Sequence, residues 1–435
     1  MFAGAFMMGA KDRLLPPSVP YRFFATAVVL HFAGWAALLA GAEDVPGFQG
    51  GLGPALAGLH LMTLGVLAMT AIGAAFQLLP VATRRQLGPV WACRLTWWLY
   101  APGVAVLGLG MATAAPWALH AGAALTVAGL ALFGVLVARN LLQVTDLPSV
   151  TLHVWLALAS LAALAGLGVA LVVDIDAGFL GHRASAAAAH AVLGGYGFMG
   201  MLAMGFSYVL VPMFVLAQPV PDRVGRTTAA VSLLALGLGA GGALAGQGVV
   251  AALGGLAGLV AVGLHVKGLM EVLKTRMRRK LEPFFRLVKA AWALLPASVL
   301  AGVALALGAP SELVAPLWGF LLVFGWLLSF VTGVLQRIMP FLASMHSGAD
   351  GRKPALLSQL TASRPLAIHA ACHGAAVVLI TAGLMAPSPL AVAAGAGLGL
   401  AGATAFAAFA VELMRRYRNH QRTHPPQDNG ELARC

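Results

Sequence analysis

A spacing of small and rigid residues recurs three times inside long apolar runs of this chain. In each copy, a glycine is followed eight residues later by a second glycine and seven residues after that by a proline. The copies are Gly65/Gly73/Pro80, Gly197/Gly205/Pro212 and Gly325/Gly333/Pro340. The prolines at 80, 212 and 340 are 132 and 128 residues apart, so the 435 residues divide into three tandem units of about 130. This self-similarity predicts a fold built from three copies of one structural unit.

The composition places these units in a membrane. Hydrophobic residues make up 60% of the chain and charged residues only 9%, whereas soluble domains carry about 25% charged residues. The apolar runs are continuous and rich in Ala, Leu and Gly, without the alternation of a membrane β-barrel. A helical span needs roughly 20 apolar residues, and on this basis we predict an all-α polytopic protein with twelve spans. They cover 21–42, 54–81, 92–113, 117–139, 151–174, 187–216, 226–246, 248–273, 287–308, 313–343, 365–386 and 389–414.

The three units therefore hold four spans each. Repeat 1 covers residues 21–139, repeat 2 covers 151–273 and repeat 3 covers 287–414. An N-terminal segment, 1–20, precedes them, and no cleavable signal peptide is recognisable in it. The polar tail 415–435 is predicted to be disordered because it has too few apolar residues to form a core.

The net charge of +13 is distributed unevenly about the predicted spans. All Lys and Arg residues except Arg183 lie toward one set of ends, which the positive-inside rule places in the cytoplasm together with both termini. The short opposite loops carry Glu43, Asp44, Asp174, Asp176 and Glu312. We expect a multi-pass protein of the bacterial inner (plasma) membrane. The basic run 274–280 is expected to meet anionic lipid headgroups and not nucleic acid.

Two histidines stand just upstream of the repeated glycines. His60 precedes the first glycine of its copy by five residues, and His190 precedes its own by seven. The third repeat has Phe320 and Trp318 at these two offsets. Both imidazoles are predicted to lie one to two turns below the outer surface, where an unpaired polar group is costly. We therefore expect His60 to point into the helix bundle, and both residues are candidate metal or cofactor ligands.

Three segments carry a resemblance to a known family: HLMTLGVLAMTAIGAAFQLLPV, AHAVLGGYGFMGMLAMGFSYVLVPMF and FGWLLSFVTGVLQRIMPFL. With twelve spans in three four-helix arcs, the chain resembles subunit I of the haem-copper oxidases. It is more similar to a compact subunit-I-like branch of that superfamily grouped near the NnrS proteins. The resemblance implies a b-type haem and a role in respiratory electron transfer or in the metabolism of nitric oxide and other diatomic gases. It also implies that His60 matches the low-spin haem ligand of the second helix.

The family pattern is incomplete in this chain. The span 226–246 has no histidine where the oxidases have a copper-binding pair, and the span 313–343 has none where they have two haem ligands. His346 lies beyond Pro340, and the position four residues after His190 is Gly194 instead of the family's tyrosine. We therefore expect no complete oxygen-reducing centre, and the sequence leaves open whether the protein is an enzyme.

His60 is the first candidate haem ligand, and His190 or His31 is the candidate second one. Two axial histidines suit electron transfer, whereas one histidine and an open position suit binding of a diatomic gas. No CxxCH motif occurs, so covalent c-type attachment is excluded. Copper(I) is a weaker alternative, because thioether and imidazole form a soft ligand set and methionines lie near both histidines. They are Met62, Met199, Met201 and Met204.

His369 and His373 form a second histidine pair, spaced to share one helix face. With His153, His265 and His346 they lie toward the predicted cytoplasmic side. We expect these imidazoles to reach water or lipid headgroups near the interface instead of forming a metal site.

Two other functions remain open at this point. A membrane transporter or metal permease also fits twelve spans, although transporters usually show two repeats of six helices. A cofactor-free assembly scaffold fits as well, since no residue is compelled to be a ligand. The expected partners are membrane lipids and respiratory or cytochrome subunits.

Overall fold

The structure, a computed structural model, describes residues 14–278, 280–348 and 352–425. Twelve helices in these ranges are long and apolar enough to cross a membrane, and no strand occurs there. This confirms the all-helical, multi-pass prediction. The first six spans are α2 (Ser18–Ala40), α3–η2–α4 (Pro54–His60, Leu61–Ala68, Met69–Thr83), α5 (Val90–Thr113), α6 (Pro116–Leu141), α7 (Pro148–Ala177) and α8–η3–α9 (Arg183–Val192, Leu193–Gly200, Met201–Val215). The others are α10 (Asp222–Leu244), α11 (Gly248–Lys274), α12 (Phe285–Ala306), α13–η4–α14 (Ser311–Phe320, Leu321–Leu328, Ser329–Ser347), α16 (Ser363–Met385) and α17 (Pro389–Thr423).

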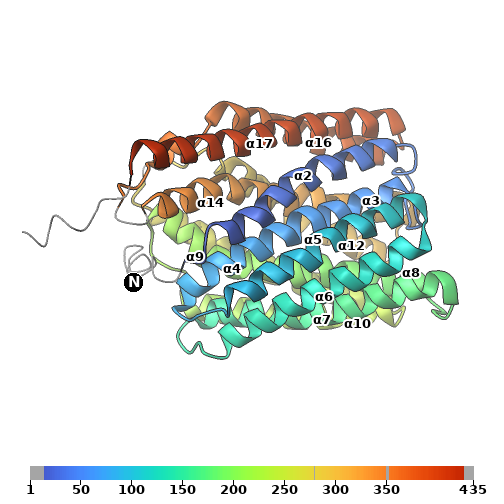
Figure 1. The fold of residues 1–435 in the computed structure, drawn as a ribbon. Coiled ribbons are helices and arrows are strands. Elements are labelled where there is room, and N and C mark those ends of the chain that lie inside the picture. Colours follow the sequence, from blue (N-terminus) through green and yellow to red (C-terminus); the bar gives the residue numbers. More distant parts are fainter. Residues whose placement is uncertain (1–13, 279, 349–351, 426–435) are drawn as a thin grey trace, which may run out of the picture.

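The spans lie side by side with their long axes in one general direction (Figure 1). We call the end where α2, α5 and α7 begin the basic end. The opposite end is the acidic end: Glu43 and Asp44 lie in a loop there, and Glu312 lies in the first turn of α13. At the basic end, α17 continues to Thr423, so helix extends into the tail for which composition predicts disorder. Residues 426–435 of that tail lie outside the described residues.

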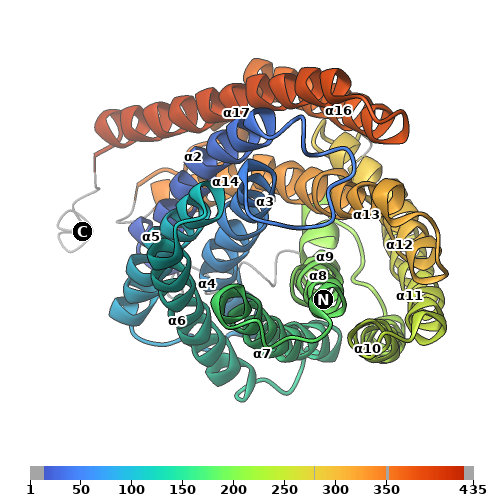
Figure 2. The ribbon, with the colours of Figure 1, turned by 90° about the vertical axis from the view of Figure 1, so that its right-hand side faces the viewer.

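Three spans form the centre of the bundle, and we call them the central helices: α3–η2–α4, α8–η3–α9 and α13–η4–α14. In their most apolar 18-residue windows, 89%, 89% and 78% of the residues are buried, against 22–50% in the other nine spans. The π segment η4 contacts both η2 and η3. The outer helices surround these three, as the view onto the acidic end shows (Figure 2). Residues on the central helices are therefore the ones best shielded from lipid.

Each central helix contains one π-helical segment of eight residues, at the same place in the repeat. The segments η2, η3 and η4 begin at Leu61, Leu193 and Leu321, so they carry the same offsets of 132 and 128 residues as the prolines. The first glycine of each sequence copy is the fifth residue of its π segment. π segments are rare and occur frequently at functional sites. The sequence repeat thus has a structural counterpart on all three central helices.

The repeated glycines lie where a central helix meets the span that precedes it. A Cβ on Gly65 would come within 2.8 Å of Leu30, and one on Gly197 would come within 2.6 Å of Ser160. The second glycine of each copy also packs on the preceding span. A Cβ on Gly73, Gly205 or Gly333 would come nearest to Phe23, His153 or Leu287, respectively. The glycines allow close helix packing in a bilayer, where no hydrophobic effect drives helices together. The repeated glycines thus serve the packing of each central helix on the span before it.

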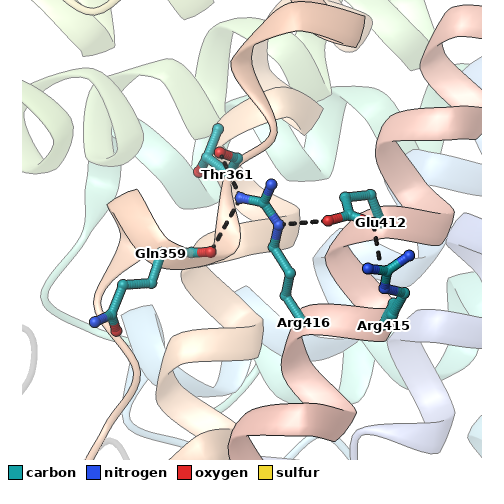
Figure 3. Close-up of polar contacts among 5 residues, drawn as sticks. All are labelled: Gln359, Thr361, Glu412, Arg415 and Arg416. Atoms are coloured by element: carbon teal, nitrogen blue, oxygen red, sulfur yellow. Dashed lines mark hydrogen bonds and ion pairs between the residues drawn. The ribbon is translucent and has the colours of Figure 1, made fainter.

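Polar contacts at the basic end attach the last span to the chain before α16 (Figure 3). The Arg416 guanidinium donates to the carbonyl oxygens of Gln359, in α15 (Leu357–Leu360), and of Thr361, at 3.2 and 3.3 Å. It also pairs with Glu412 at 2.8 Å, and Arg415 approaches the same carboxylate at 3.7 Å. The extension of α17 beyond the apolar span is therefore held by specific hydrogen bonds.

The first glycines of the three copies are packed to different degrees, so the change from glycine to alanine should destabilise the protein unequally at these positions. Gly65→Ala and Gly197→Ala should each lower stability by about 1–3 kcal/mol, because a well-packed contact must accommodate a methyl group. Gly325→Ala should be tolerated, since its Cβ would meet nothing closer than Leu294 at 3.5 Å. Thermal unfolding of the three purified variants in one detergent checks this. Equal losses in all three would contradict the packing described here.

Candidate functional site

The two histidines upstream of the repeated glycines face each other across two central helices. His60 is the last residue of α3, directly before η2, and His190 lies in α8, three residues before η3. Their ring centres are 6.4 Å apart and their ring planes differ by 33°. Both side chains are partly buried. The structure therefore brings together two candidate ligands that are 130 residues apart in sequence, and His60 points into the bundle as expected.

Hydrogen bonds determine which nitrogen of His60 is available. Its Nδ1 lies 3.1 Å from the carbonyl oxygen of Leu56. A carbonyl only accepts, so Nδ1 carries the proton, and Nε2 of the neutral ring keeps a free lone pair. On His190, the buried Nδ1 has no hydrogen-bond partner among the described residues. The ring of His190 packs on Gly168 of α7, where a Cβ would come within 3.1 Å of Cε1.

A second group of imidazoles contains the third candidate ligand. The ring centre of His31, on α2, is 5.9 Å from that of His369, and His369 is 5.9 Å from His373 in a stacked pair. These side chains are only 2%, 1% and 2% exposed. The prediction that His369 and His373 reach water or headgroups is therefore wrong. Their shared face turns toward α2, α14 and α17, whose side chains cover it.

Each imidazole in this second group has one nitrogen with a hydrogen-bond partner. Trp35 donates its Nε1–H to Nε2 of His31 at 3.1 Å, and His369 donates Nδ1–H to the carbonyl of Gly402 at 3.1 Å. Nε2 of His373 is 2.7 Å from the hydroxyl of Ser329. Nε2 of His369 and Nδ1 of His373 remain buried without a hydrogen-bond partner in the described residues. No ring contact joins His31 to the His60–His190 pair, so the structure places His31 in a separate group.

A third group lies between α7, α9 and α11. The Tyr208 ring is 5.2 Å from the His153 ring and 5.3 Å from the His265 ring. Its hydroxyl is 3.2 Å from Nδ1 of His265, and Nδ1 of His153 donates to the carbonyl of Ser149 at 2.7 Å. His153 and His265 are also buried, so the expectation of contact with water or headgroups is wrong for them too. His346, at the end of α14, is 6% exposed and likewise covered.

The four candidate methionines do not gather around one site that could hold copper(I). The Met62 side chain packs on Gly34 of α2, whereas Met201 and Met204 line a cavity that includes neither His60 nor His190. Met199 is 5% exposed within the core. Among the described residues, no group of three or more His, Cys, Asp or Glu side chains is placed to hold a metal ion. A metal at the His60–His190 pair would therefore have two protein ligands from these residue types.

Comparison with known proteins identifies no relative: no family model matches the chain, and no curated protein sequence matches it.

The sequence signal for the second histidine group was the four-residue spacing of His369 and His373, which places both on one face. Nothing in the sequence showed that other helices cover that face. Ser329 carries no motif and becomes notable only through its contact with His373.

The contact between Ser329 and His373 predicts a stability effect. Ser329→Ala should cost about 1–2 kcal/mol, because it leaves a buried imidazole nitrogen without its partner. Ser207→Ala is the matched control, since the Ser207 hydroxyl bonds only the carbonyl four residues earlier, at 2.6 Å. Chemical unfolding in mixed micelles measures both. The contact with His373 contributes nothing if the two variants lose the same stability.

Proposed function

We propose that this protein is a membrane-embedded b-type haem protein in which His60 and His190 hold the iron, acting in respiratory electron transfer or in the metabolism of diatomic gases such as nitric oxide. The observation that carries the proposal is the separation of the two ring centres, 6.4 Å. Two imidazoles that share one metal ion have ring centres up to about 6.2 Å apart, because a metal–nitrogen bond is about 2.0 Å and each nitrogen lies about 1.1 Å from its ring centre. The pair is therefore spaced to suit a single metal ion.

The ring nitrogens of His60 and His190 also support the proposal that this pair holds iron. The bond from Nδ1 of His60 to the Leu56 carbonyl leaves Nε2 as a ligand atom and orients the ring. Histidine ligands are commonly held in this way by their second nitrogen. The backbone of Leu164 interacts with the His190 ring, but the buried Nδ1 makes no hydrogen bond of good geometry, so a ligand or a closer proton acceptor would satisfy it. A haem held by His60 and His190 would supply one-electron chemistry or bind a diatomic gas.

The arrangement of the helices supports a subunit-I-like architecture of three four-helix repeats. Each central helix packs on the span before it: on α2, α7 or α12. The last span of each unit packs on the first span of the next, in the pairs α6–α7, α11–α12 and α17–α2. Together with the three equivalent π segments, these contacts fit a pseudo-threefold bundle. We further propose that the basic end faces the cytoplasm of a bacterium, because positively charged loops are retained there.

Visible spectroscopy of the purified protein tests the haem assignment. We expect a Soret band, and His60→Ala and His190→Ala should each remove most of the haem per mole of protein. His182→Ala is the matched control, because His182 is exposed at the same end and lies outside the three histidine groups. A spectrum without haem, or full haem content in both ligand variants, would contradict the proposal. Metal analysis of the same samples then distinguishes a bare metal ion from a protein without cofactor.

Oxygen reduction should be absent. The complete centre needs several histidines on the spans α10 and α13–η4–α14, but α10 has none and the third central helix has only His346, at the basic end. Oxygen consumption with an artificial reduced donor should therefore stay at the level of the buffer control. Rapid, cyanide-sensitive turnover would show that the active site is elsewhere, with the His31–His369–His373 group as the first place to look.

A further inference from the structure

A cavity of about 390 Å³ lies between the second and third central helices and the spans α10, α11 and α12. This volume is within the range of about 300–1,000 Å³ found for small-molecule sites. Its lining includes Ala184 and Ser185 at the start of α8, Gly246 and Gly248 between α10 and α11, and Ala306 at the end of α12. The cavity therefore reaches the acidic end of the bundle, the end seen in Figure 2.

The lining restricts the ligand to an uncharged molecule. All lining residues are described by the structure, and none carries a charge or an imidazole. Most are glycine, alanine or branched aliphatic residues. A charged group enclosed by these walls would lose its hydration without compensation. Water-soluble substrates and metal ions are therefore poor occupants, whereas a membrane-soluble molecule suits the walls.

Aromatic rings line another part of the cavity. Tyr196 stacks on Trp326 with ring centres 5.7 Å apart and planes 21° from parallel. Trp318 donates to the Tyr196 hydroxyl at 3.2 Å, Tyr196 donates to Ser298 at 3.0 Å, and Ser298 donates to the carbonyl of Leu295 at 2.7 Å. The donors of Trp318, Tyr196 and Ser298 are therefore in use, and the stacked rings of Tyr196 and Trp326 present a flat surface to the cavity.

The cavity lining also contains a buried hydroxyl on α10. Ser232 is 2% exposed, and its Oγ has no hydrogen-bond partner in the described residues. It lies ten residues after the start of α10 at Asp222, about 15 Å along a helix with a rise of 1.5 Å per residue. The hydroxyl is thus near the middle of the span. A buried hydroxyl without a partner is unfavourable, and an oxygen atom of a bound molecule would accept its hydrogen bond.

From these features we infer that the cavity binds a lipid-soluble molecule of the quinone class: a flat, uncharged ring bearing a carbonyl oxygen and an apolar tail. The ring would lie against the Tyr196–Trp326 wall, the carbonyl would accept from Ser232, and the tail would follow the small residues toward the acidic end. This site does not depend on the proposed haem ligands, which lie outside the cavity lining.

Titration of the full-length protein with decylubiquinone in detergent tests the inference, with quenching of tryptophan fluorescence as the readout. We expect saturable binding, because Trp318 and Trp326 line the cavity. Gly258→Leu should weaken binding at least tenfold, since its Cβ would meet only Val299 and Ala235, at 3.8 and 3.9 Å, and the rest of the side chain would fill the cavity. Gly237→Leu is the matched control: the same change on α10, at an exposed position with nothing within 4 Å. It should bind like the unchanged protein.

Ser232→Ala tests the hydrogen bond separately and decides the question if Gly258→Leu does not fold. Loss of the bond should weaken binding about five- to tenfold. Binding unaffected by Ser232→Ala would overturn the assignment of a carbonyl ligand, and binding unaffected by Gly258→Leu would place the ligand elsewhere. A Soret band lost in Gly258→Leu but kept in His60→Ala would show that haem occupies the cavity, which would also overturn the inference.

Discussion

The close packing of the three central helices in an apolar interior is the constraint on which the rest of this structure depends. In hydrocarbon, backbone polar groups must be satisfied within the helices, and helices associate through packing and not through the hydrophobic effect. Gly65, Gly73 and Gly197 meet this requirement by removing the side chain where the preceding span crosses. The π segments lie at these same crossings and change the helical register locally. Their threefold recurrence suggests that one solution to the packing problem was repeated.

The same constraint explains why the buried histidines gather. An isolated imidazole in an apolar bundle would lose its hydrogen bonds with water, so each needs a partner from another helix or from its own backbone. His31, His369 and His373 share partners among themselves and with Trp35 and Ser329. His153 and His265 share Tyr208. His60 and His190 differ, because their rings face each other with no side-chain hydrogen bond between them. The proposed iron would complete this arrangement.

The cavity and the histidine pair divide the central helices into two regions of different chemistry. His60 and His190 place two imidazoles near the acidic end, whereas the walls near Tyr196 and Ser232 present aromatic surface and the unpartnered hydroxyl of Ser232. An iron ion would suit the first region and an uncharged organic molecule the second. Both regions involve α8–η3–α9, so one central helix serves two proposed sites from different faces.

The sequence by itself determined the membrane class, the twelve spans and the positions of the three glycine–proline copies, because hydrophobicity and local spacing are properties of short segments. It also marked His60 and His190 as candidates, because each stands five to seven residues before the first glycine of its copy. Only the tertiary structure decided which histidines meet: His31 joined His369 and His373, and the face of α16 expected to reach water is covered by other helices. The cavity beside Ser232 was equally beyond prediction. Contacts between distant helices depend on how each helix is rotated about its axis, and the π segments alter that rotation without a signal in hydropathy.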